Sequence, residues 1–174
     1  MPKKYHRNRE LAKLLRTKNF RETKILSLMI DDYNILDENR IKDIMHIIDT
    51  QELTEQLVLN ILEKDKNFYP LALKLIQSEK EFDITSGFVL YARIATINSD
   101  LKDDFFEKFF NRGVELSDND NLNIRKSIAR AFRQTALRNF DLKKKVLLKM
   151  IEIKNQKSKT ADLVYEEVVP LIDF

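Results

Sequence analysis

The stretch EFDITSGFVLYARIATIN, residues 81–98, decides the fold. Its apolar residues recur around most of the circumference of a helix, and it contains one glycine and no proline. A helix that is apolar on nearly every side has to be covered by its neighbours. The sequence therefore predicts a central helix over 81–98, in which Gly87 indicates the close approach of a second helix.

Glycine is scarce in the rest of the chain as well. The 174 residues contain two glycines, three prolines and no cysteine. Sheet-rich domains of this size need many turn positions with positive φ, which glycine usually supplies. Gly87 and Gly113 are isolated, so a glycine-rich phosphate loop is excluded. The composition favours an all-α protein without disulfides, thiolate metal ligands or a cysteine nucleophile.

Helical periodicity and capping signals predict about ten helices with short connections. Asp37 is expected to cap the third helix, and Asp49 with Glu52 forms a candidate capping box at the start of the fourth. In the first helix, three leucines are expected on one face, namely Leu11, Leu14 and Leu15. The helices are expected over 7–18, 20–34, after Asp37, after DTQE (49–52), over 69–79, 81–98, 101–116, 121–138, 141–155 and 160–172.

Helices of this length with short loops pack as antiparallel neighbours. Ten of them without a long crossover favour stacked helix pairs of the HEAT type, at roughly 40 residues per pair. We therefore expect one domain over residues 1–174, an all-α, HEAT-like α-α superhelix. A compact irregular helical domain is the competing architecture.

Positive charge is concentrated late in the chain. Residues 121–160 contain twelve Lys or Arg against two Asp or Glu, although the whole chain has a net charge of +3. On a helical wheel, Lys126, Arg130 and Arg133 lie opposite the apolar stripe of the helix over 121–138. Segregated cations of this kind are typical of a surface for an anionic partner, and a solvated helix face is the simpler alternative. The predicted phosphate-binding residues are Arg125, Lys126, Arg130, Arg133, Arg138, Lys143, Lys144 and Lys145.

NIRKSIARAFRQTALRN (123–139) resembles the late helix of the DNA alkylation repair family, the AlkD-like glycosylases built from HEAT-like helix pairs. In that family the helix reads as a lysine, a small residue, an aliphatic residue and an aromatic residue, and it closes on an arginine. Lys126, Ser127, Ile128 and Arg133 match this order. RNRELAKLLR (7–16), ETKILSLMIDDY (22–33), IDTQELTEQL (48–57) and SEKEFDITSGFVLYARIA (78–95) resemble other family segments.

The resemblance implies excision of alkylated purines by a carboxylate and aromatic residues, but this chain departs from that pattern. Glu55 stands where the family has its aspartate and is the only candidate for a catalytic carboxylate. A longer carboxylate without the family's neighbours is a poor copy, because catalysis needs placement to within about half an ångström. The other departures are Gln51 and Phe82 in place of two tryptophans, Thr85 and Ser86 in place of paired arginines, and Arg130 in place of an aromatic residue.

Together these observations predict a repair-related helical-repeat protein that binds duplex DNA through its backbone, without sequence specificity and without full glycosylase activity. A protein-interaction scaffold and an active alkylpurine DNA glycosylase are the alternatives. We expect no cofactor and no metal, since His6 and His46 have no partner at metal-binding spacing. We also expect a monomer in the cytoplasm without membrane contact, because no apolar run approaches roughly 20 residues.

Overall fold

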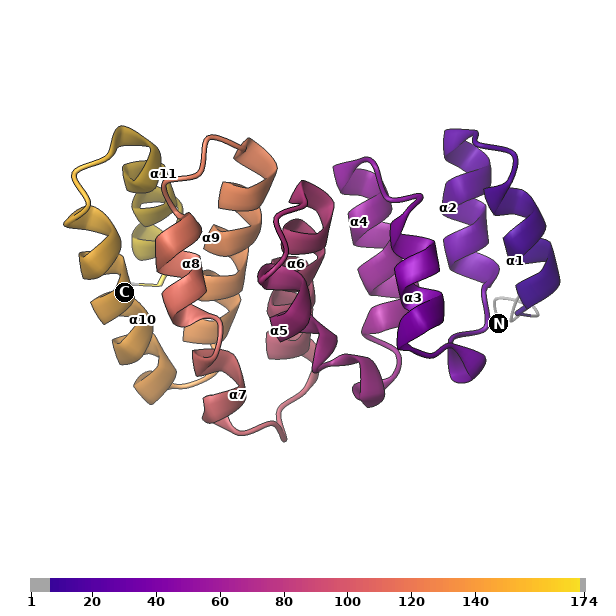
Figure 1. The fold of residues 1–174 in the computed structure, drawn as a ribbon. Coiled ribbons are helices and arrows are strands. Elements are labelled where there is room, and N and C mark those ends of the chain that lie inside the picture. The colour runs from indigo at the N-terminus through magenta and orange to yellow at the C-terminus, as the bar shows by residue number, and fades with distance from the viewer. Residues whose placement is uncertain (1–6, 173–174) are drawn as a thin grey trace. The chain divides into compact units, whose positions relative to one another are not determined.

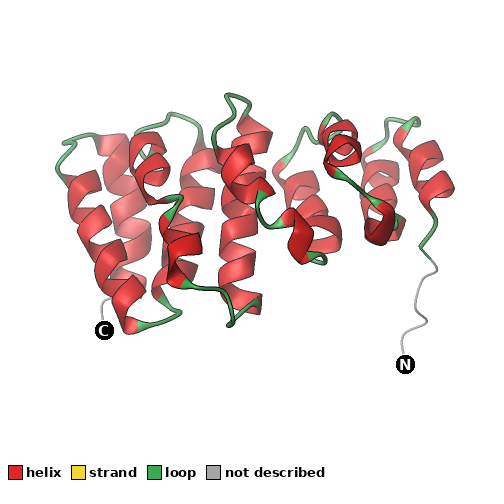
Figure 2. Ribbon diagram, turned by 60° about the horizontal axis from the view of Figure 1, so that its bottom comes forward, coloured by secondary structure: helices red, strands yellow, loops and turns green. Residues whose placement is uncertain are grey.

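The computed structural model describes residues 7–172, and all of their regular secondary structure is helical (Figure 2). The prediction of an all-α protein is therefore confirmed. The α-helices are α1 (Arg9–Arg16), α2 (Arg21–Ile30), α3 (Glu38–Met45), α4 (Gln51–Leu57), α5 (Leu71–Ile76), α6 (Glu81–Ile97), α7 (Asp103–Glu107), α8 (Phe110–Leu116), α9 (Leu122–Ala136), α10 (Phe140–Lys154) and α11 (Lys159–Val168). Four shorter segments are the 3-10 helices η1 (Tyr33–Ile35), η3 (Lys66–Phe68) and η4 (Val169–Leu171) and the π-helix η2 (Val58–Leu62).

The described residues form two compact units, which meet between Tyr69 and Pro70. Unit 1 contains α1–α4 with η1–η3, and unit 2 contains α5–α11 with η4. Each unit is described by itself below, and the expectation of one domain over residues 1–174 stays a prediction. None of the helices in the described range combines the length and the apolar character that a membrane crossing requires.

A buried ion pair ties the two helices at the start of unit 1 together. Both terminal nitrogens of Arg16 in α1 donate to Oδ2 of Asp31, the C-cap of α2, at 2.7 Å. The Asp31 side chain is fully buried, and its Oδ1 accepts from the backbone N–H of Asp32 at 2.9 Å. The backbone N–H of Asn8 donates to the carbonyl of Ile30, so α1 and α2 run antiparallel. The pair fixes which face of α1 meets α2.

Arg16 points inward, and the face of α1 that carries the leucines is not its buried face. Leu11 and Leu14 are exposed, and Ala12 is the buried residue of the helix. The predicted N-cap at Asp37 is confirmed by its bond from Arg40 N–H. The capping box at Asp49 is wrong, because Thr50 caps α4 and Asp49 is drawn away to Lys24, at 2.6 Å.

Helix α6 is the centre of unit 2, as its sequence predicts. It is buried from Ile84 to Ala92 without interruption, and it packs mainly against α5 and α9. A Cβ added at Gly87 would lie 2.6 Å from Ile76 Cγ2 and 2.8 Å from the carbonyl oxygen of Ala72. The predicted close approach at Gly87 is therefore confirmed, and the approaching helix is α5.

The single helix predicted over 101–116 is wrong, because the chain leaves the α-helix at Lys108 and Phe109 and forms α7 and α8. The break lets the ring of Phe109 meet Phe88 and Tyr91 of α6 and Phe132 of α9, with centroids 6.0, 4.9 and 5.0 Å apart. Aromatic pairs at such distances contribute beyond their buried area. The stabilisation from these ring contacts exceeds the cost of interrupting the helix at Lys108 and Phe109.

The helices of unit 2 stack as repeated pairs, with α6, α9 and α11 in one row and α5, α8 and α10 in the other (Figure 1). Side chains bond from each pair to the next at a nearly constant interval. Asn123 bonds to Glu81 at a separation of 42 residues, Gln134 to Thr96 at 38, and Arg112 to Ile76 at 36. This interval matches the roughly 40 residues of a HEAT repeat, although the sequence shows no repeated pattern of residues.

Replacing Gly87 with alanine tests the approach of α5 to α6. Alanine is favoured over glycine in a helix by roughly 1 kcal/mol. Two of the three nearest atoms, however, belong to the backbone of α5 and cannot rotate away. Overpacking costs about 1–3 kcal/mol, so we expect Gly87→Ala to lower the free energy of unfolding, measured in urea. A variant that is more stable than the parent would contradict the tight contact.

Replacing Arg16 with alanine tests the buried pair in unit 1. The change leaves the Asp31 carboxylate buried without its cation, which costs about 3–5 kcal/mol. Lys13→Ala is the matched control, since Lys13 is in the same helix and its pair with Glu10 is exposed. We expect the control to change the free energy of unfolding by less than about 0.5 kcal/mol. Equal effects of both substitutions would mean that the pair adds no stability.

Candidate nucleic-acid interface

Helix α9 carries the candidate interface, and its start is well defined. The side chain of Asn121 caps the helix by accepting from the backbone N–H groups of Asn123 and Ile124, at 2.9 and 3.2 Å. The predicted break at residues 117–120 is confirmed, since they lie outside the helices. From this start, one broad side of α9 is buried in the core. The buried residues are Ile124, Ser127, Ile128, Ala129, Ala131, Phe132, Thr135 and Ala136.

Three cations occupy the opposite side of α9, and we call Lys126, Arg130 and Arg133 the α9 ridge. Lys126 is exposed, and the two arginines are partly exposed. No acidic residue occurs within α9. The guanidinium of Arg133 lies near the end of α11, where Nη1 is 3.4 Å from the backbone carbonyl of Glu167. The ridge therefore presents positive charge that its own helix does not neutralise.

Arg125 lies beside the ridge rather than on it. Its Nη1 donates to the backbone carbonyl of Asn119 at 2.7 Å, which holds the side chain against the loop before α9. Its Nε is buried and has no hydrogen-bond partner among the described residues. The side chain also lines a cavity of about 180 Å³ with Leu122, Leu163, Val164 and Glu167, between α9 and α11. Arg125 thus borders the ridge and this cavity.

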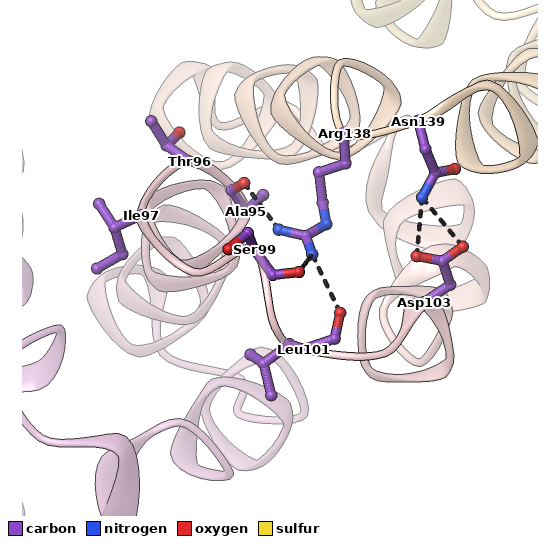
Figure 3. Close-up of a pocket in the computed structure, with 8 residues that line it drawn as sticks. All are labelled: Ala95, Thr96, Ile97, Ser99, Leu101, Asp103, Arg138 and Asn139. Carbon is purple, nitrogen blue, oxygen red and sulfur yellow. Dashed lines mark hydrogen bonds between the residues drawn. The ribbon is translucent and has the colours of Figure 1, made fainter.

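Arg138 points into the protein, and its hydrogen bonds connect the turn after α9 to the end of α6, one repeat earlier. Figure 3 shows its guanidinium at the end of α6, where it donates to the carbonyls of Ala95, Ser99 and Leu101 at 3.0–3.3 Å. It also donates to the carbonyl of Asn98, at 2.6 Å. Its flat face stacks on the ring of Phe106, 4.2 Å from the centroid. Burial lowers the pKa of the guanidinium, partly offset by Asp103. The carbonyls of Ala95 and Asn98 are at the end of α6, where a helix leaves acceptors without partners, and those of Ser99 and Leu101 belong to the following loop.

The three lysines at the start of α10 belong to the other row of helices. Lys145 donates to Glu107 of α7 at 2.5 Å, and this hydrogen bond raises the pKa of the lysine. Lys144 lies 4.2 Å above the ring of Phe140, a cation–π contact. Lys143 is partly exposed and makes no hydrogen bond or ion pair with the described part of the chain. These lysines and the α9 ridge therefore lie on different rows of helices.

The positions that replace the glycosylase residues lie in several environments. Thr85 and Ser86, in place of the paired arginines, are fully buried in α6 and face away from solvent. Glu55 lies in α4 of unit 1 and accepts a hydrogen bond from Gln51 Nε2 at 3.3 Å. Residues 7–172 contain no group of three or more His, Cys, Asp and Glu side chains that could hold a metal ion. The arginine positions of the family are therefore unable to contact DNA here.

Sequence analysis missed the cavity between α9 and α11. Leu122 is 51% exposed and Leu163 is 46% exposed, and both lie at its rim, while Val164 is buried. The cavity forms because two helices about 40 residues apart in the sequence pack together. Local sequence patterns do not predict that contact. Exposed leucines next to a charged helix face are the only hint that the sequence offers.

No protein-family model matches the chain, and no curated protein matches it. A solved structure has a similar fold, with a TM-score of 0.70 and 18% sequence identity over 86% of this chain. That protein is described as a new family of proteins related to the HEAT-like repeat DNA glycosylases with affinity for branched DNA structures. This chain spans 65% of its length. The likeness confirms the HEAT-like fold.

Arg138→Lys separates a structural role of this residue from a role in DNA binding. Lysine keeps the charge but cannot reach four carbonyls with a single ammonium group. We expect the free energy of unfolding to fall by about 2–4 kcal/mol, and DNA affinity of the folded variant to stay that of the parent. Unchanged stability together with weaker DNA binding would contradict the structural role of Arg138 and would mean that this residue contacts DNA.

Proposed function

We propose that this protein binds DNA through the phosphate backbone and that the α9 ridge is its main contact. The observation that carries the proposal is the ridge itself, three cations on the exposed side of a helix that has no acidic residue. The affinity of the structurally similar protein for branched DNA supports the same class of partner. Because that protein is longer and only 18% identical, its activity is not transferred as a whole.

The spacing of the ridge fits the spacing of phosphates. Lys126 and Arg133 are seven residues apart, which corresponds to about 10 Å along a helix. One strand of B-DNA advances about 3.4 Å per phosphate along its axis, so the ridge is long enough for about three phosphates of a strand. The guanidinium groups of Arg130 and Arg133 can bind phosphate oxygens through two parallel hydrogen bonds, and Lys126 acts as a point charge.

Contacts of this kind position a protein on DNA but read no sequence. We therefore propose binding without sequence specificity, to DNA that includes branched structures, for which the structural neighbour is described as having affinity. We propose no full glycosylase activity, and the burial of Thr85 and Ser86 supports this. A function in DNA repair follows from this proposal as an expectation.

The Lys126→Glu, Arg133→Glu double variant tests the proposal. Two of the three ridge cations become anions, so we expect affinity for a 20-base-pair duplex to fall by a factor of about 100 or more in fluorescence anisotropy at low salt. Lys42→Glu, Lys108→Glu is the matched control, because it changes the net charge equally. Both control lysines are exposed and make no hydrogen bond or ion pair with the described residues. Lys42 lies in α3, and Lys108 lies between α7 and α8.

We expect the control variant to lose less than a factor of about five, through the weaker long-range attraction alone. Equal losses of DNA affinity in the two double variants would mean that the ridge acts only through the net charge of the protein. Binding of the ridge variant at the level of the parent would reject the interface, and the protein-interaction scaffold would become the better explanation of the fold.

A further inference from the structure

The cavity between α9 and α11 combines apolar walls with one donor and one acceptor. Leu122, Leu163 and Val164 supply the apolar surface, and Arg125 and Glu167 the polar groups. Its volume of about 180 Å³ is well above the share of a single water. It is below the roughly 300–1,000 Å³ of pockets for drug-sized ligands. The space therefore suits one flat ring system.

The cavity is next to the α9 ridge. Leu122 is one helical turn before Lys126, which places neighbouring side chains about 5–6 Å apart on a helix surface. On the α11 side, Glu167 connects the two features, since its side chain lines the cavity and its carbonyl lies 3.4 Å from Arg133 Nη1. A DNA strand whose phosphates contact Lys126 and Arg133 therefore passes the mouth of the cavity.

The charges of the cavity select a base over a phosphate. The carboxylate of Glu167 opposes an anion, and together with the guanidinium of Arg125 it leaves the cavity without net charge. Arg125 lines the cavity, and its guanidinium has further N–H donors beside the one at Nη1 that bonds to Asn119. A nucleobase offers apolar faces together with acceptors and donors on its edge, and proteins bind unstacked bases by contacts to both.

We infer that this cavity holds the base of one unpaired nucleotide in the strand that the α9 ridge contacts. Leu122 and Leu163 pack on the faces of the base, the guanidinium of Arg125 donates to its edge, and the Glu167 carboxylate accepts from it. This inference rests on the proposed function. It adds a specificity for DNA sites at which a base has already left the stack, because such a base enters without the cost of unpairing.

The test compares two DNA duplexes of the same sequence, one of which has an additional, unpaired 2-aminopurine in one strand. We expect the parent protein to bind the bulged duplex about tenfold more tightly than the plain duplex, in anisotropy titrations at one salt concentration. We also expect 2-aminopurine fluorescence to rise on binding, because the probe leaves its stacked neighbours.

Leu122→Ser and Leu163→Ser, made separately, remove the apolar contacts from half-exposed positions. We expect each to reduce the preference for the bulged duplex to less than about twofold, while affinity for the plain duplex stays that of the parent. Leu148→Ser is the control, since Leu148 is 61% exposed on α10 in the other helix row. It is expected to keep the full preference.

The outcomes separate this inference from the proposed function. A parent protein that binds both duplexes equally, or serine variants that keep the preference of the parent, would overturn the base site and leave backbone binding intact. An unchanged 2-aminopurine signal in the bound state would also overturn it. If neither duplex binds at low salt, the proposed function fails, and the inference fails with it.

Discussion

The packing of α6 against α9 is the contact on which unit 2 depends. Because α6 is apolar on nearly every side, it is stable only when other helices cover it, and α9 provides the most extensive cover. Covering α6 and the neighbouring α8, α10 and α11 uses the whole apolar stripe of α9. The cations of α9 are therefore directed to the one side that remains. The position of the ridge therefore follows from the burial of the apolar side of α9.

The interval of about 40 residues between bonded partners explains how the repeats stay aligned. Arg138 is the clearest case, because a side chain from the turn after α9 satisfies the carbonyls that end α6, one repeat earlier. In such a stack each pair of helices contacts its neighbours in the sequence, so stability is close to a sum of local terms. On α9 one side stays exposed, and this side is cationic.

The sequence predicts the parts of this structure that depend on local pattern. The central position of α6, the close approach at Gly87 and the outward direction of Lys126 follow from composition and periodicity. Contacts between repeats do not follow from them. The break between α7 and α8 is set by Phe88, Tyr91 and Phe132 of other helices, Thr50 caps α4 because Lys24 binds Asp49, and Arg138 turns inward to carbonyls about 40 residues away. The cavity at Leu163 has the same origin.

Binding of the parent protein to a plain duplex over a series of salt concentrations tests the central claim, the contact between the α9 ridge and phosphates, most directly. Each phosphate contact releases counterions and contributes about −0.9 to the slope of log affinity against log salt. Three contacts give a slope of about −2.7, and further cations would make it steeper. An affinity that does not change with salt, or no binding at the lowest salt, would contradict the account.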